Sequence, residues 1–184
     1  LGGIGETKAA IDSLREKTIR AGFPGLHLQG VLWSNIPASL ANVPGDRSQT
    51  QNNTVTYLGF DSLTNYQWCH YVQPRGDYRK WADTAIAAWE KWVHDFSIPF
   101  YPHVSIGWDT NPRFKILLED VINGNTPELF GNYLVKAMKF ADDRKLSPRL
   151  ITVNSWNEWG EGSYLEPDTI NGMGYLEAVK AAVG

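Results

Sequence analysis

The sequence predicts an α/β protein, specifically the C-terminal half of a (β/α)8 TIM-type barrel with about four β/α units. Three observations lead to this fold class. Short apolar segments alternate with helical segments, the apolar segments lack the alternation of a half-exposed sheet, and the long loops rich in aromatic and polar side chains follow them. Catalytic side chains of such barrels collect at the C-terminal ends of the strands, so this asymmetry favours a barrel.

The first third of the chain contains one helical and two apolar segments. Residues 6–21 carry apolar side chains at helical spacing among charges, and Gly22 ends this predicted helix. Residues 25–33 predict the first strand. A polar loop rich in Ser, Asn, Gln, Pro and Gly then runs to Asn53, and residues 54–58 predict a second short strand.

The middle of the chain predicts a loop, a helix and a strand. Residues 61–77 form an aromatic and polar loop, residues 78–96 form a helix that ends before Pro99, and residues 100–106 form the third strand. Tryptophans of this helix are spaced near multiples of a helical turn and are expected in the core: Trp81, Trp89 and Trp92.

The last third of the chain repeats the alternation. Residues 107–113 form a terminal loop after the third strand, and residues 127–144 predict a helix with Thr126 as its N-cap. Residues 150–153 predict the fourth strand and residues 174–183 the last helix.

A closed barrel needs eight strands and typically about 250 residues, whereas this chain has 184 residues. It also begins without Met, in a segment that leads into a helix. We therefore expect residues 1–184 to form a single partial domain, with an N-terminal half-barrel segment supplied by the same or another chain. An open, doubly wound sheet is the alternative.

Composition limits the class of partner. A hydrophobic share of 42%, a charged share of 20% and a net charge of -3, without a Lys or Arg run, indicate a globular protein that binds neither nucleic acid nor membrane. The single cysteine, Cys69, excludes an internal disulfide, and the four histidines lack metal-ligand spacing. We expect a neutral carbohydrate partner, no metal and no cofactor.

The chemistry is expected in residues 154–168, which follow the fourth predicted strand. Glu158 and Glu161 lie three residues apart, with Trp156 and Trp159 beside them. Glycoside hydrolysis commonly uses two carboxyl groups, and aromatic rings stack on sugars while apolar surroundings raise one carboxyl pKa. Two glutamates at this spacing are also frequent on solvated helix faces, but glycines at 160 and 162 interrupt a helix.

The same residues resemble a known family. The string Asn-Glu-Trp-Gly-Glu-Gly at residues 157–162 resembles the Asn-Glu-Trp-His-Glu-Gly pattern of glycoside hydrolase family 99, which includes the endo-α-mannosidases. Residues 156–159 and the Leu-Glu-Pro-Asp string at 165–168 are similar to the signature of the related WbsX-type group. Fainter similarities cover residues 21–26, 59–63 and 107–113.

This resemblance implies a (β/α)8 barrel with the motif after its last strand. It also implies that Glu158 takes a proton from the 2-hydroxyl of the substrate, which attacks the anomeric carbon, and that Glu161 protonates the leaving oxygen. Configuration would be retained. Gly160 stands where the endo-α-mannosidase pattern has His, so mannoside specificity does not carry over.

Further side chains at strand ends and in the motif are candidates for sugar binding. Tyr66 resembles a family tyrosine near the anomeric centre or is a packing residue, and Asp109 binds a hydroxyl or caps the following turn. Arg113 supplies charge or pairs with Asp109. The candidate substrate-binding residues are Trp33, Tyr66, Trp68, Trp108, Asp109, Arg113, Trp156, Asn157, Trp159 and Tyr164.

Three functions remain open from the sequence. The first is a retaining glycoside hydrolase that cleaves an oligo- or polysaccharide with Glu158 and Glu161. The second is a WbsX-type glycosyltransferase in polysaccharide biosynthesis, although no glycine-rich phosphate loop or Asp-x-Asp pair is present. The third is a carbohydrate-binding protein without catalysis.

Overall fold

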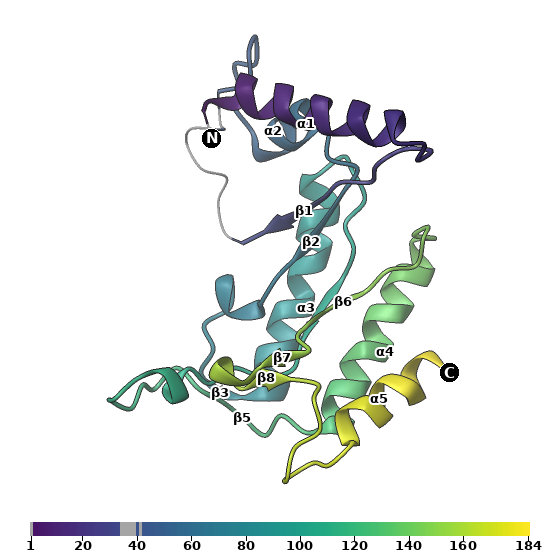
Figure 1. Ribbon diagram of the computed structural model, residues 1–184. Helices are drawn as coiled ribbons and strands as arrows, with labels where there is room; N and C mark the ends of the chain where they lie inside the picture. Colours follow the sequence, from purple (N-terminus) through teal and green to yellow (C-terminus); the bar gives the residue numbers. More distant parts are fainter. Residues whose placement is uncertain (1, 34–39, 41) are drawn as a thin grey trace. The chain divides into compact units, whose positions relative to one another are not determined.

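The computed structural model describes residues 2–33, 40 and 42–184 (Figure 1). They form a mixed α/β structure in which five α-helices accompany short paired strands, an arrangement compatible with a partial α/β barrel. The chain divides into two compact units, which are described separately. The N-terminal unit comprises Leu1–Thr64 and Glu90–Phe100, and the C-terminal unit comprises Asn65–Trp89 and Tyr101–Gly184.

The N-terminal unit contains α1 (Ile4–Arg20), β1 (Gln29–Leu32), α2 (Gln51–Leu58) and most of β2 (Ser62–Asn65). β1 pairs with β2, and Leu63 of β2 forms a parallel bridge with Phe100. α1 and β1 begin and end within a few residues of the helix and the strand that the sequence predicts at residues 6–21 and 25–33.

The predicted strand at residues 54–58 is wrong, because these residues belong to α2. The Thr50 hydroxyl accepts a hydrogen bond from Asn53 N at 3.1 Å and caps the first turn. Gly59 closes the helix with a left-handed φ of 82°, and Val55 and Leu58 are buried on one face. The strand lies four residues farther on, as β2.

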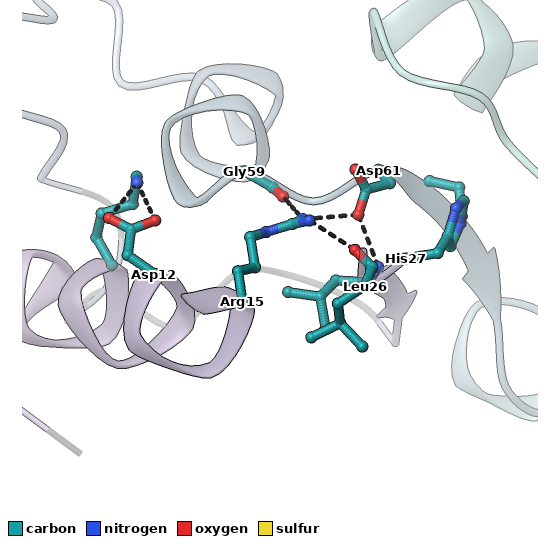
Figure 2. A network of polar contacts seen from close by, with 9 residues as sticks. Asp12, Arg15, Leu26, His27, Gly59 and Asp61 are labelled. Atoms are coloured by element: carbon teal, nitrogen blue, oxygen red, sulfur yellow. Dashed lines mark hydrogen bonds and ion pairs between the residues drawn. The ribbon is translucent and has the colours of Figure 1, made fainter. Parts of the chain in front are cut away.

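Arg15 joins three segments of the N-terminal unit (Figure 2). Its guanidinium donates to the carbonyl oxygens of Leu26 and Gly59 and to Oδ2 of Asp61, each at 2.6 Å. Asp61 Oδ2 also accepts from Leu28 N at 2.7 Å. Arg15 thus ties α1 to the segments that precede β1 and β2. Leu26 belongs to residues 21–26, and Gly59 and Asp61 belong to residues 59–63, so two of the fainter family-like strings have a structural role here.

The C-terminal unit holds the remaining elements. They are η2 (Trp68–His70), β3 (Gly76–Asp77), α3 (Tyr78–Asp95, whose last turns belong to the N-terminal unit), β4 (His103–Ser105), η3 (Asn111–Arg113), β5 (Ile122–Asn123), α4 (Pro127–Asp143), β6 (Thr152–Asn154), β7 (Asn157–Glu158), η4 (Trp159–Glu161), β8 (Ser163–Tyr164) and α5 (Gly174–Val183).

Parallel pairing organises the C-terminal unit, as the apolar strand segments predict. β4 pairs with β6 in parallel, with Ser105 opposite Asn154, and β3 pairs with β5 in parallel. β7 and β8 form an antiparallel pair. Each sheet contains two strands in the described residues, so a closed barrel remains a prediction.

Aromatic side chains fill the core of the C-terminal unit. Trp81 and Trp89 are buried, as their helical spacing predicts, and Trp81 packs edge-on against Trp68 with ring centroids 5.1 Å apart. α4 begins where expected, because Thr126 caps it by accepting from Leu129 N at 3.2 Å. Among the described residues, no helix combines the length and apolar character needed to cross a membrane.

Candidate active site

The two glutamates lie in a tight hairpin directly after β6. β7 and β8 place Glu158 opposite Ser163, and the η4 turn between them ends at Gly162, whose φ of 60° is left-handed. Ser155 Oγ accepts from Glu158 N at 3.2 Å and donates to Ser163 O at 3.0 Å. The hairpin therefore fixes the backbone on both sides of the pair. It is not a solvated helix face.

Arg113 bridges the two carboxylates. Its Nη2 lies 2.9 Å from Oε2 of Glu158, and its Nη1 lies 2.9 Å from Oε1 of Glu161. The exposed fractions of the side chains are 46% for Arg113, 36% for Glu158 and 14% for Glu161. The Oε2 atom of Glu161 is buried without a hydrogen-bond partner among the described residues. Both carboxylates thus converge on one guanidinium.

The loop that carries Arg113 packs closely on the hairpin. Asp109 N donates to Glu161 O at 2.7 Å. A Cβ atom at Gly162 would lie 3.0 Å from Asp109 Cβ, so the left-handed turn and the close packing both favour glycine. Asp109 Oδ1 accepts from Asn111 N at 2.9 Å, so Asp109 caps its turn, one of its two predicted roles. Arg113 reaches the glutamates instead of Asp109.

Three side chains that follow β2 respond electrostatically to Glu161. Desolvation raises the pKa of the Tyr66 hydroxyl, and the charges of Glu161 and Glu158 raise it further. Desolvation, and then Glu161, raise the pKa of Cys69 to about 12, which keeps this thiol protonated. Burial lowers the pKa of His70, against the opposing effect of Glu161. Tyr66 stacks on His70, with ring centroids 5.8 Å apart. The structure thus brings Tyr66 to the carboxylate pair.

Buried polar side chains behind the hairpin were missed by sequence reasoning. Gln67 and Asn154 are fully buried, and Gln67 Nε2 donates to Asn154 Oδ1 at 2.5 Å and to Gly107 O at 3.2 Å. Ser163 Oγ donates to Asn154 O at 2.8 Å. Only their positions in the sequence could have indicated these two residues. Gln67 follows Tyr66, and Asn154 directly follows the apolar segment before the motif.

Aromatic side chains of the motif form one stacked pair. Trp159 and Tyr164 lie with ring centroids 3.7 Å apart at an interplanar angle of 15°, and Trp159 Nε1 donates to Glu166 Oε2 at 2.5 Å. Trp159 and Trp156 have exposed fractions of 44% and 54%. Asn157 is exposed, opposite Tyr164 in the hairpin. These side chains leave ring surface open beside the carboxylates.

The remaining tryptophan candidates are dispersed. Trp68 is fully buried, and its indole donates to His103 O at 3.0 Å, so the expected sugar-stacking role is corrected to a role in the core. Trp108 is half-buried and its carbonyl accepts from Ile122 N. Trp33 is exposed but belongs to the N-terminal unit, and its substrate role stays a prediction. In the described residues, no three His, Cys, Asp or Glu side chains gather to hold a metal ion.

Comparison with known proteins places the chain in a family. Residues 3–179 match the family model described as Glycosyltransferase WbsX. Among curated proteins, the chain is similar to the uncharacterized protein WxcX of Xanthomonas campestris pv. campestris, in two strains, with 28% identity over 109 residues. The similar region covers 59% of this chain and only 15% of the length of these relatives. With nearly its whole length matched by the model, the chain belongs to the WbsX glycosyltransferase family.

Proposed function

We propose that this chain carries the catalytic carboxylates of an enzyme that cleaves a glycosidic bond in an oligo- or polysaccharide with retention of configuration. One observation carries the proposal: Glu158 and Glu161 extend from one hairpin and converge on a single guanidinium. Retaining glycosidases need two carboxyl groups close together on either side of the scissile bond. A hairpin with a buried polar network behind it keeps such a pair in place.

The two carboxylates occupy different environments, which suits two different roles. Glu158 is the more exposed, and it accepts the proton of the substrate 2-hydroxyl, whose oxygen forms a bond to the anomeric carbon as the bond to the leaving oxygen breaks. Glu161, whose side chain is only 14% exposed, transfers a proton to the leaving oxygen as that bond breaks. Glu161 then takes a proton from the water that opens the 1,2-anhydro sugar, and Glu158 returns its proton to the 2-oxygen.

The substrate class follows from the side chains around the pair. Trp156, Trp159 and Tyr164 offer ring faces to a pyranose, and Tyr66 lies in the electrostatic field of both glutamates. Asn157 adds an exposed amide for a hydroxyl. A neutral polysaccharide suits this set. The complete site belongs to a (β/α)8 barrel whose N-terminal half lies in the same or another chain.

Glycosyl transfer is the second candidate function, and the description of the family favours it. The same carboxylates serve transfer when an acceptor hydroxyl replaces water at the second step. Glu161 then takes the proton of the acceptor hydroxyl, whose oxygen forms the new glycosidic bond. Hydrolysis and transfer therefore share the roles of Glu158 and Glu161 and differ in the acceptor.

A product analysis tests the proposal. The natural protein is incubated with a panel of polysaccharides and aryl glycosides, with and without disaccharide acceptors, and the released sugars are identified by mass spectrometry. We expect bond cleavage by the wild type and loss of about 10² to 10⁴ of the rate in Glu158→Gln. Wild-type rates in both Glu158→Gln and Glu161→Gln contradict a catalytic pair. Transfer products formed only with an acceptor select the second function.

A further inference from the structure

The side chain of Arg113 lies across the backbone of Gly160. A Cβ atom at residue 160 would come within 2.6 Å of Arg113 Nε and 3.3 Å of Arg113 Cγ. Real Cβ atoms do not approach other heavy atoms as closely as the first of these contacts. Gly160 is not among the glycines with positive φ, so its backbone accepts an ordinary residue. The obstacle to a side chain at residue 160 is therefore Arg113 itself.

The backbone of the loop holds Arg113 in this position. Arg113 N donates to Thr110 O at 2.9 Å at the end of η3. Asn111 closes the loop by donating from Nδ2 to Leu118 O at 3.2 Å and accepting from Leu118 N at 2.6 Å. Together with the bond from Asp109 to the hairpin, these contacts fix where the arginine side chain begins.

The shape of the guanidinium matters because each terminal nitrogen serves a different carboxylate. The planar fork presents its N–H groups in a fixed geometry, whereas a lysine ammonium is a compact charge on a flexible stem. Glu158 and Glu161 each receive one charge-assisted hydrogen bond of 2.9 Å. One arginine thereby sets the orientation of both carboxylates toward each other.

We propose that Arg113 is a positioning residue for the Glu158–Glu161 pair, and that Gly160 is the residue that admits it. The proposal rests on the proposed function and adds a specificity element to it. Any side chain at residue 160 moves the guanidinium away from the carboxylates, so substitution of Gly160 and removal of the guanidinium produce the same defect. A relative with a side chain at this position needs a different partner for its glutamates.

Carbodiimide labelling measures the contact without a substrate. The natural protein is treated with a water-soluble carbodiimide and glycine ethyl ester, and the labelling rates of Glu158 and Glu161 are read by peptide mass spectrometry. We expect several-fold faster labelling of Glu158 in both Arg113→Gln and Gly160→Ala, and no further increase in the double variant. Arg113→Lys gives an intermediate rate, because it keeps the charge but loses the fork.

The controls separate this effect from general loosening. Gly25→Ala adds a methyl group where no atom lies within 4 Å and leaves the rates unchanged, and Glu128, at the start of α4, serves as an internal reference. Additive rates in the double variant, or a wild-type rate in Gly160→Ala, overturn the coupling of Gly160 to Arg113. Wild-type rates in Arg113→Gln overturn the positioning role.

Activity distinguishes this proposal from the proposed function. On any substrate that the wild type cleaves, Arg113→Gln and Gly160→Ala should each lower kcat on the order of 10²-fold with a smaller change in KM, because misplaced catalytic groups slow the chemical step. If labelling responds as expected while Glu158→Gln and Glu161→Gln keep full activity, the arginine bridge stands and the proposed function fails.

Discussion

Gln67 and Asn154 join the two chain segments that bring Tyr66 and the glutamate hairpin together. Gln67 directly follows Tyr66, Asn154 ends β6 before the hairpin, and Gln67 Nε2 donates to Asn154 Oδ1 at 2.5 Å inside the protein. Both side chains are fully buried, so water cannot replace the bond when it is lost. A buried polar contact behind the hairpin therefore holds the two segments of the site together.

Gln67→Met tests this contact, because methionine keeps the length of the side chain and removes its donor. Asn154 Oδ1 and Gly107 O then lose a buried partner, and we expect the free energy of unfolding to fall by about 1 to 3 kcal/mol in urea denaturation. The matched control is Gln73→Met, since Gln73 is exposed and only 3.5 Å from Asp120. Equal stability of the Gln67 and Gln73 variants would show that the buried contact contributes nothing.

Truncation of two tryptophans of the candidate set should change the free energy of unfolding by very different amounts. Trp68 is buried among Tyr78, Trp81 and Tyr133, so Trp68→Ala should lower the free energy of unfolding by about 3 to 5 kcal/mol. Trp156 has 54% of its surface exposed, so Trp156→Ala should change stability by less than about 0.5 kcal/mol. Thermal denaturation of both variants checks the assignment, and a destabilised Trp156→Ala would place that ring in the core.

His103 should make stability depend on pH. The imidazole is buried between Thr152 and Ser105, and desolvation lowers its pKa from 6.5 to about 3. Between these pH values the unfolded chain binds a proton that the folded chain does not, so the free energy of unfolding falls as pH falls. The slope from this group reaches about 1.4 kcal/mol per pH unit.

His103→Gln should remove that contribution, so the difference between variant and wild type shifts in favour of the variant as pH falls from 6.5 toward 3. Urea denaturation at several pH values measures it. His94→Gln is the control, because 89% of the His94 side chain is exposed. Parallel pH curves for the wild type and His103→Gln would refute a neutral buried His103.

Four of the five helices that the structure describes were predictable from the sequence, because their signals are local. The apolar spacing and the Thr126 cap located α4, and the pattern at residues 174–183 located α5. The prediction of a strand at residues 54–58 was wrong because two local signals conflict there. The β-branched residues of this segment favour a strand, but the cap from Thr50 and the turn at Gly59 make it helical. Local signals of comparable strength then compete, and the context decides.

The candidate site was predictable in its sequence motif and not in its long-range contacts. Glu158, Glu161 and the aromatic rings beside them stand within one string, so their proximity follows from the chain. Arg113 is 48 residues from Glu161, and Gln67 is 87 residues from Asn154. Such pairs depend on how segments pack. Trp68 was misassigned because a tryptophan in a predicted loop carries no mark of burial.

The most direct test of the catalytic pair compares leaving groups in the natural protein. Cleavage of a dinitrophenyl glycoside needs no proton from an acid, whereas cleavage of an unactivated sugar linkage does. We expect Glu161→Gln to keep kcat/KM, which reports the bond-breaking step, on the dinitrophenyl substrate and to lose it on the sugar linkage, while Glu158→Gln loses both and Glu128→Gln loses neither. Full activity of Glu158→Gln and Glu161→Gln on both substrates would show that the two glutamates are not the catalytic pair.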